Sequence, residues 1–378
     1  MVVRFGVVGT GNIGSQHIQL LLSGKIKGAA LAATASRSAS GLQTGVPHFT
    51  DYREMFDNAD IDAVLIATPT MNHVEMAQQA IERGLPIMME KPLAMSVHQA
   101  EMLLALVPDK LQFAVMLNQR FHPAYAKLKQ LLMDDAIGNL QRVGWTMTTW
   151  YRPDIYYQVS NWRGTWPGEG GGLLINQCIH NLDVLQWLAG LPNSITANVG
   201  FGKHHDIDVE DEVSAIMTFD NGAIGTLIAS SGEAPGINRL EIVGDRGRLV
   251  FEDGVIEVQR SGESTQTHCR TTHEMFGMPT FAREVIGITE ESNQHAVVLQ
   301  NFVDSLATGI ELMTPADQGL GSLQIANGIL LSAWNNETVT LPIDVNQYEA
   351  RLQEKINNAS LRTPKNLKAK VNMEKSYR

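Results

Sequence analysis

The stretch Val3-Arg-Phe-Gly-Val-Val-Gly9-Thr-Gly11-Asn-Ile-Gly14 decides the fold of this 378-residue chain. An apolar run ends in Gly-x-Gly-x-x-Gly and passes directly into a helical pattern. Gly9 permits a tight turn, Gly11 lets backbone N–H groups approach a pyrophosphate, and Gly14 lets the helix pack close to the strand. Three glycines alone are weak evidence, because loops are rich in glycine. The strand before them and the helix after them predict dinucleotide binding.

The composition is that of an ordinary globular protein, with 44% hydrophobic and 18% charged residues. The length allows two domains, each with its own core. A formal charge of −11 argues against binding to nucleic acid or to an anionic membrane. The chain has only two cysteines, which is typical of a reducing compartment. A strand that begins at residue 3 leaves no room for a signal peptide, and no run of 18 apolar residues is present to span a membrane. We therefore expect a soluble, cytoplasmic protein.

Strand and helix patterns alternate through the first 119 residues. Strands are expected at 3–8, 29–35, 63–67, 86–89 and 113–117, and helices at 15–23, 72–83 and 96–106. Such alternation predicts a parallel, doubly wound sheet, with the ligand crevice at the carboxyl ends of its strands. Residues 1–119 are therefore predicted to form a dinucleotide-binding Rossmann domain. The residues that follow its strand ends, and that are expected to line one cleft, are Gly11, Ser36, Thr68, Lys91 and Asn118.

The end of the second strand bears on the choice of dinucleotide. An acidic residue about 20 positions after the glycines would bind the ribose diol of NAD, but Ser36 and Arg37 stand there instead. Arginine suits a 2′-phosphate because its planar donors meet phosphate oxygens in pairs. The sequence therefore favours NADP, with NAD as the second choice and a solvated surface role as the alternative for Arg37.

The pattern changes after about residue 120. Strands are expected at 140–150, 195–201, 213–219, 223–229, 248–252 and 255–260, with two-residue hairpin signals at Asn221-Gly222 and Asp253-Gly254. Residues 120–342 are thus predicted to be an α+β domain with a large, mostly antiparallel open sheet, for substrate binding and oligomerisation. A final helix near 315–335 is expected, with the option of packing back on the first domain. Residues 343–378 are poor in apolar side chains and are predicted to be a tail or arm.

A polar set lies within Gly170-Gly-Gly-Leu-Leu-Ile-Asn176-Gln-Cys-Ile-His180-Asn-Leu-Asp183. An apolar stripe predicts a helix here, on which Asn176, His180 and Asp183 at i, i+4 and i+7 share one face. A histidine that merely satisfies a buried hydrogen bond is the plain alternative. A metal site is not expected, because no companion His or Cys spacing is present.

Four motifs in this order resemble the glucose–fructose oxidoreductase, inositol dehydrogenase and MocA family of sugar and polyol dehydrogenases. They are Gly9-x-Gly11-x-x-Gly14, Ala67-Thr68-Pro69 with Asn72-His73, Glu90-Lys91-Pro92, and the Gly-Gly-Gly helix with His180 and Asp183. The resemblance implies that Lys91 lies by the nicotinamide and the substrate hydroxyl, and that His180 is the general acid/base. Where the family often has Asp, this chain has Asn176, which cannot accept a proton but can bind a sugar hydroxyl.

The resemblance also extends the expected cofactor-binding set. It comprises Gly9, Thr10, Gly11, Asn12, Ile13, Gly14, Ser36, Arg37, Ala67, Thr68, Pro69, Asn72, His73, Glu90, Lys91 and Asn118.

An aromatic and charged loop precedes the polar segment. Its Tyr157, Trp162 and Arg163 are expected to join Asn176 and Asp183 in binding substrate, since aromatic faces stack on sugar rings and Arg bonds hydroxyls. Packing of this loop on its own domain is an equal alternative.

The sequence thus predicts an NAD(P)-dependent oxidoreductase that acts on a secondary alcohol of a sugar, inositol or glycoside. A histidine with a pKa near 7 suits removal of the hydroxyl proton, and a lysine ammonium stabilises the alkoxide. A redox-assisted glycosidase and a non-enzymatic dinucleotide-binding regulator remain as alternatives. A homodimer or homotetramer is expected.

Overall fold

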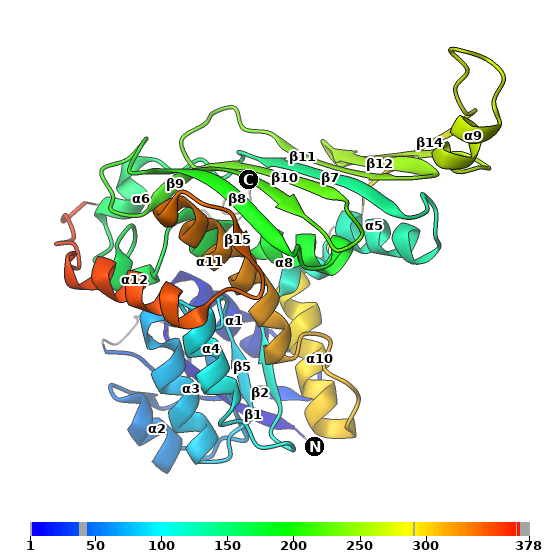
Figure 1. Cartoon of the computed structure of the whole chain (residues 1–378). Helices are drawn as coiled ribbons and strands as arrows, with labels where there is room; N and C mark the ends of the chain where they lie inside the picture. The colour runs from blue at the N-terminus through cyan, green and yellow to red at the C-terminus, as the bar shows by residue number, and fades with distance from the viewer. Residues whose placement is uncertain (1, 38–43, 290–291, 368, 371–378) are drawn as a thin grey trace.

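The computed structural model describes residues 2–37, 44–289, 292–367 and 369–370, and these form two β-sheets with helices between and around them (Figure 1). The first sheet is parallel, with six strands in the order β3-β2-β1-β4-β5-β6. Its strands are β1 (Val3–Val8), β2 (Ala29–Ala35), β3 (His48–Phe49), β4 (Ala63–Ile66), β5 (Ile87–Met89) and β6 (Phe113–Val115). The predicted Rossmann sheet is confirmed, and the short edge strand β3 is the one that the sequence patterns missed.

The helices of the first domain are α1 (Asn12–Leu22), α2 (Tyr52–Asn58), α3 (His73–Glu82) and α4 (Val97–Leu104). Three of them match the predicted ones, and the short α2 was not predicted. Helix α4 begins at Ser96, whose hydroxyl accepts a hydrogen bond from Gln99 N at 3.3 Å. A serine cap of this kind satisfies one of the free N–H groups of the first turn.

The second sheet has nine strands in the order β14-β13-β12-β11-β7-β10-β9-β8-β15. Its strands are β7 (Leu140–Met147), β8 (Ser194–Phe201), β9 (Glu210–Thr218), β10 (Ile224–Ser230), β11 (Asn238–Gly244), β12 (Gly247–Glu252), β13 (Val255–Arg260), β14 (Ala282–Gly287) and β15 (Val339–Thr340). All neighbours are antiparallel except β7 and β10. The predicted mostly antiparallel open sheet is confirmed.

One of the two predicted hairpin turns differs from its prediction. Asp253-Gly254 makes the expected two-residue turn, with φ of +48° and +74°. Between β9 and β10, Phe219 N donates to Ala223 O, so three residues rather than two form the loop. Gly222 takes a φ of +81° there, which glycine adopts without strain.

The remaining helices follow the first domain along the chain. They are α5 (Pro123–Met133), α6 (Asp154–Gln158), α7 (Trp166–Glu169), α8 (Ile179–Ala189), α9 (Thr265–Thr271), α10 (Gln294–Thr308), α11 (Gly319–Asn335) and α12 (Val345–Asn357). Helix α11 matches the predicted final helix and packs on both domains, against β8 and α8 on one side and α4 on the other. Asn327 Oδ1 in α11 accepts a hydrogen bond from Val97 N at 2.9 Å.

Helix α10 returns to the first domain after β14, before the short edge strand β15 is added to the large sheet (Figure 1). Its Leu299 and Phe302 are buried in a cluster with Phe5 and Val7 of β1. The rings of Phe5 and Phe302 have centroids 6.1 Å apart. The Rossmann domain therefore uses residues from beyond the predicted boundary at 119 to cover one face of its sheet.

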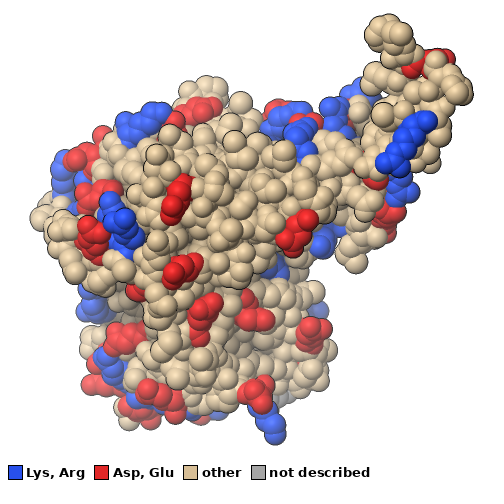
Figure 2. Space-filling view, viewed as in Figure 1, with Lys and Arg blue, Asp and Glu red and all other residues tan. Residues whose placement is uncertain are grey.

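The outer face of the large sheet carries exposed apolar side chains. Ile216, Ile224 and Ile228 point away from the core on neighbouring strands β9 and β10. The segment around α9 projects from the body, and its Met275 and Phe276 are almost fully exposed (Figure 2). Such surfaces commonly mark contacts between chains. The homo-oligomer stays a prediction, which light scattering of the purified protein tests.

None of the helices in the described ranges is both long and apolar enough to cross a bilayer.

The segment predicted as a tail begins with a packed helix. In α12, Tyr348 and Leu352 lie one turn apart and are buried, and the Tyr348 ring stacks on Trp334 at 5.2 Å. Glu349 in the same helix accepts a hydrogen bond from the Ser96 hydroxyl that caps α4. The few apolar residues of this charged segment predict a tail, but Tyr348 and Leu352 pack a helix against the rest of the protein.

Replacement of Leu352 tests whether α12 belongs to the folded unit. Leu352→Ala removes a fully buried side chain and is expected to lower the free energy of unfolding by about 2–5 kcal/mol. Urea denaturation measures this, with Gln353→Ala on the exposed face as the matched control. Equal stability of the two variants would mean that α12 contributes nothing to the fold.

Candidate active site

A cleft of about 1330 Å³ lies between the two domains, at the carboxyl ends of the Rossmann strands. Most of the site residues predicted from the sequence line it. From the first domain these are Gly9, Thr10, Gly11, Asn12, Ile13, Ser36, Arg37, Ala67, Thr68, Pro69, Asn72, Glu90 and Lys91. From the second domain they are Trp162, Arg163, Asn176 and His180. The structure thus brings the glycine loop, the lysine and the histidine to one cavity.

The glycine loop has the geometry of a dinucleotide cradle. Gly9 takes a φ of +93°, and a Cβ on Gly14 would lie 1.8 Å from Gly9 O, so both positions demand glycine. A Cβ on Gly11 would meet nothing within 4 Å, because the open cleft lies beyond it. Gly11 directly precedes α1, whose free N–H groups and positive end favour phosphate. These residues fit the pyrophosphate of a dinucleotide.

Besides Gly14, two residues of the expected cofactor set, His73 and Asn118, do not line the cleft. The ring nitrogens of His73 lie 2.8 Å from Pro92 O and 2.9 Å from Thr68 O, which fixes the loops after β4 and β5. Asn118 is buried, with Nδ2 3.3 Å from Nδ1 of His295 in α10.

Glu90 is the carboxylate next to Lys91, and it is held in its charged form. Its Oε1 lies 2.7 Å from Nε2 of His17, which is fully buried in α1. Burial alone would raise the pKa of Glu90, but the hydrogen bond and the charge of His17 outweigh it and lower the pKa to about 2. The pair locks the strand end that carries Lys91 onto the helix that follows the glycine loop.

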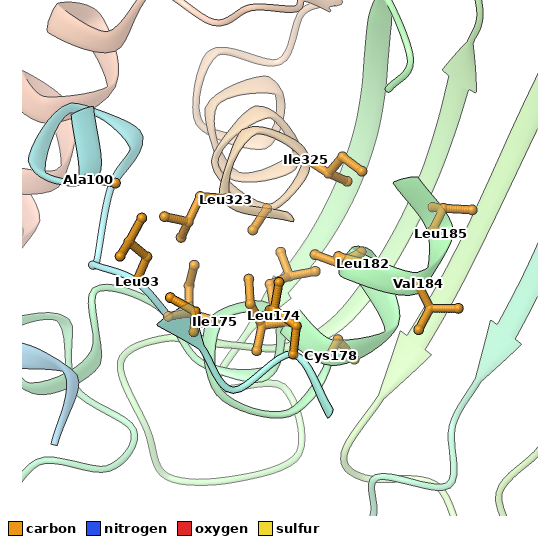
Figure 3. Packing of buried hydrophobic residues seen from close by; sticks show 14 of the residues in the cluster. Leu93, Ala100, Leu174, Ile175, Cys178, Leu182, Val184, Leu185, Leu323 and Ile325 are labelled. Atoms are coloured by element: carbon orange, nitrogen blue, oxygen red, sulfur yellow. The ribbon is translucent and has the colours of Figure 1, made fainter. Parts of the chain in front are cut away.

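The Gly170–Gly172 turn brings the second domain against this strand end. A Cβ on Gly170 would lie 2.5 Å from Met95 Cβ, and a Cβ on Gly172 would lie 2.4 Å from Glu210 O. The buried Glu210 carboxylate accepts hydrogen bonds from Gly172 N at 2.8 Å and Leu174 N at 2.9 Å. Apolar side chains of the two domains interlock beside the turn, among them Leu93, Leu174, Ile175 and Leu323 (Figure 3).

The chain beyond the turn is not the uniform α-helix that the sequence predicted. Cys178 N donates to Leu173 O, five residues back, so residues 173–177 form a wider π-turn, and α8 begins only at Ile179. Such turns are rare and are frequently found at functional sites. Asn176 and His180 both reach the cleft, but Asp183 does not.

Asp183, which was expected to bind substrate, forms a buried ion pair. Its Oδ1 and Oδ2 accept hydrogen bonds from Arg120 Nη2 at 2.6 Å and from Nε at 2.7 Å. Both side chains are about 95% or more buried. The two residues are 63 positions apart, so no local sequence pattern could show that the Asp183 carboxylate is bound to Arg120 and not to substrate.

Lys91, Asn176 and Glu169 form a chain of contacts. Lys91 Nζ donates to the backbone oxygen of Asn176 at 2.8 Å, and Asn176 Nδ2 donates to Glu169 Oε1. Glu169 Oε2 also accepts from Gly164 N at 2.6 Å. Burial raises the pKa of Glu169 to about 7, against the opposing effect of these hydrogen bonds. Glu169 ends the aromatic and charged loop, where the sequence offers it as a possible partner for sugar hydroxyls; in the structure it supplies a carboxyl group beside Asn176, the position where the resembling family often has Asp.

His180 is held in its neutral form. Its side chain is buried, and desolvation together with the nearby Lys91 charge lowers its pKa well below the ordinary value. Burial also lowers the pKa of Lys91. A neutral imidazole beside an ammonium group can accept a proton from a hydroxyl whose developing charge the ammonium stabilises.

The aromatic loop divides between the cleft and the core. Tyr156, Trp162 and Arg163 line the cavity. Tyr157, which was expected to contact substrate, is buried, with its ring centroid 4.9 Å from that of His205. Sequence reasoning also missed Arg152 and Lys370, which line the cleft. The excess of basic residues after 343 was the available signal for Lys370.

No group of three or more His, Cys, Asp or Glu side chains in the described part of the chain is placed to hold a metal ion.

Two family models match the chain, one for each domain. Residues 3–118 match an oxidoreductase family with an NAD-binding Rossmann fold, and residues 125–250 match the GFO/IDH/MocA C-terminal domain. Among characterised relatives, inositol 2-dehydrogenase of Arthrobacter sp. (strain FB24) is 30% identical over 282 residues, which cover 68% of this chain and 73% of that protein. Inositol 2-dehydrogenase of Rhizobium meliloti (strain 1021) is 24% identical over 353 residues, covering 90% and 100% of the two chains.

Solved structures share the fold. The WlbA dehydrogenase of Chromobacterium violaceum, in complex with NADH and UDP-GlcNAcA, superposes with a TM-score of 0.78 at 24% identity, over 91% of this chain and 97% of that one. A levoglucosan dehydrogenase in complex with NADH and levoglucosan gives 0.74 at 22% identity, over 90% and 100%.

The pKa of Glu169 predicts how stability depends on pH. Between pH 4.5 and about 7, Glu169 is protonated in the folded protein and ionised in the unfolded chain. The free energy of unfolding is therefore highest below pH 4.5 and falls as the pH rises to about 7. A pKa of about 7 against an ordinary value of 4.5 corresponds to on the order of 3 kcal/mol. Glu169→Gln should remove this contribution, so the unfolding free energy of the wild type should fall relative to the variant across that range.

Urea denaturation at half-unit steps from pH 4.5 to 8 measures the difference. Glu101→Gln, on the exposed side of α4, is the control. Parallel curves for the wild type and Glu169→Gln would contradict the raised pKa.

Proposed function

Because this chain belongs to the GFO/IDH/MocA family of oxidoreductases, we propose that it transfers a hydride between a secondary alcohol of a sugar, inositol or glycoside and a nicotinamide dinucleotide. The observation that carries the proposal is that Lys91 and His180 line the same cleft as the Gly9–Gly14 loop. The relatives named as inositol and levoglucosan dehydrogenases support a polyol or sugar as substrate.

The residues of the first domain would hold the dinucleotide. The N–H groups at the start of α1 face its phosphates, while Ser36 and Arg37 at the end of β2 lie where the adenosine ribose binds in Rossmann folds. When bound, the nicotinamide supplies the hydride acceptor or donor.

His180 and Lys91 would handle the substrate hydroxyl. In oxidation, the neutral His180 accepts the hydroxyl proton, and the Lys91 ammonium stabilises the negative charge that develops on the oxygen. The bond from Lys91 Nζ to Asn176 O fixes the direction of the ammonium and leaves its other two donors for substrate. The Asn176 side chain is oriented by Glu169 and is free of the proton-transfer role that an aspartate would have.

Removal of the general base should lower the turnover number without changing the affinity for the cofactor. His180→Ala is expected to lower turnover by about 10²–10⁴-fold while the Kd for the dinucleotide stays nearly unchanged. Lys91→Met should also depress the rate while the fold is preserved. Steady-state absorbance of the reduced nicotinamide and fluorescence titration of the cofactor measure the two effects, with His273→Ala on the exposed α9 segment as control.

Unchanged turnover in His180→Ala would reject its role. The same assay distinguishes a glycosidase, since a dehydrogenase accumulates reduced cofactor in proportion to product and a redox-assisted glycosidase does not.

Arg37 supports a preference for NADP over NAD. It is exposed at the end of β2, and Glu90 is the only carboxylate among the described residues that line the cleft. Arg37→Ala is expected to weaken NADP binding by about 10- to 100-fold, the loss of one charge-assisted hydrogen bond, and to affect NAD much less. Titration calorimetry with both cofactors measures this, and an equal loss for both would reject the phosphate contact.

A further inference from the structure

Two arginines share one aromatic wall on the substrate side of the cleft. The guanidinium carbon of Arg163 lies 4.4 Å from the ring centroid of Trp162 and 4.6 Å from that of Tyr156. The guanidinium carbon of Arg152 lies 5.4 Å from the same Tyr156 ring. All four side chains line the cavity. Stacking fixes the plane of a guanidinium group while its N–H donors at the edge stay able to meet an acceptor.

The positive charge of this wall extends to the reacting end of the cleft. The charges of Arg152 and Arg163 add to burial in lowering the pKa of Lys91, which places all three cations within each other's electrostatic reach. The described residues that line the cleft include five cations (Arg37, Lys91, Arg152, Arg163 and Lys370) and one carboxylate, Glu90, which is paired with His17. This concentration occurs in a chain of net charge −11.

Arg163 shows a polar atom without a protein partner. Its Nε is buried and has no hydrogen-bond acceptor among the described residues. A buried donor without an acceptor is unfavourable, because it has lost its hydrogen bond to water and gained none from the protein. The buried Glu169 carboxyl, which feels the charge of Arg163, accepts hydrogen bonds from Gly164 N and Asn176 Nδ2. An acceptor that enters with a ligand would satisfy Arg163.

The position of the two arginines relative to the phosphate cradle bears on which ligand would bring this acceptor. Arg152 and Arg163 belong to the loop around α6 and α7 of the second domain, whereas the phosphate cradle lies on the glycine loop and α1 of the first. Lys91 and His180 stand at the junction between the two sets.

We propose that Arg163, with Arg152, forms a subsite for an oxyanion of the substrate, and that the enzyme acts on an anionic sugar, either a sugar acid or a sugar phosphate. This inference rests on the proposed function and narrows its substrate class. A planar guanidinium binds carboxylate and phosphate oxygens in pairs, and a charge-assisted pair of this kind orients the ring whose hydroxyl faces His180.

Matched sugars test the inference. Glucose, glucuronate and glucose 6-phosphate, with the corresponding galactose and N-acetylglucosamine sets, are compared at constant ionic strength on the protein loaded with dinucleotide. The readouts are kcat/KM and the ligand-induced rise in Tm. For the wild type, we expect a higher kcat/KM and a larger Tm rise with the anionic member of at least one set than with its neutral member.

Arg163→Met keeps an apolar stem against the two rings and removes the charge. It is expected to lower kcat/KM for the anionic sugar by about 10- to 100-fold and to lower that for the neutral sugar by a clearly smaller factor, because a neutral sugar loses only a hydroxyl contact. Arg163→Lys should restore part of the loss. Arg270→Met, on the exposed face of α9, is the control.

The outcomes separate the inference from the proposed function. Equal Tm rises for neutral and anionic sugars, or an equal loss for both in Arg163→Met, overturn the oxyanion subsite, even if neutral sugars are oxidised. A larger Tm rise with an anionic sugar than with its neutral counterpart, without any change in nicotinamide absorbance, counts against the dehydrogenase function and leaves the subsite standing. A response to glucuronate alone or to the phosphate alone identifies which oxyanion the subsite takes.

Discussion

The site is held together by the close packing of the Gly170–Gly172 turn, which meets the segment between β5 and α4 at Met95 and strand β9 at Glu210. Gly170 leaves no room for a side chain against Met95, and Gly172 leaves none against Glu210. Because the turn sits this close, the backbone oxygen of Asn176 comes within hydrogen-bond distance of Lys91. The apolar contacts around Leu93 and Leu174 hold the two domains together at this point (Figure 3). Lys91 of the first domain and Asn176 of the second are therefore held together by packing and a hydrogen bond.

Burial determines the protonation states of the titratable groups around the cleft. Desolvation shifts carboxylic acids toward their neutral form and bases toward theirs, and both effects occur here, at Glu169 and at His180. Glu90 is the exception, since His17 compensates its charge. The site thus combines a neutral proton acceptor with several fixed cations, an arrangement suited to stabilising negative charge on oxygen.

The sequence was sufficient for the features that local patterns encode. The strands of the first domain and the Asp253-Gly254 turn follow from apolar runs and turn chemistry, and Gly9 and Gly14 from the backbone geometry that they allow. The predictions for Asp183 and for the helix that carries His180 were wrong, because local patterns did not contain the information they needed. Asp183 was read as a ligand because its partner Arg120 lies in another element, and the π-turn before α8 leaves no mark in the apolar stripe. The roles of individual site residues stay predictions.

Helix α10 has a consequence for synthesis of the protein. The Rossmann sheet and α1 are translated within the first 119 residues, yet Leu299 and Phe302 cover Phe5 and Val7 on one face of that sheet. While the ribosome is still producing the large sheet, the nascent N-terminal unit exposes this apolar face. Folding of this unit can therefore be completed only after α10, which ends at residue 308, has left the exit tunnel. A fragment that ends near residue 119 would expose an apolar surface and be prone to aggregation.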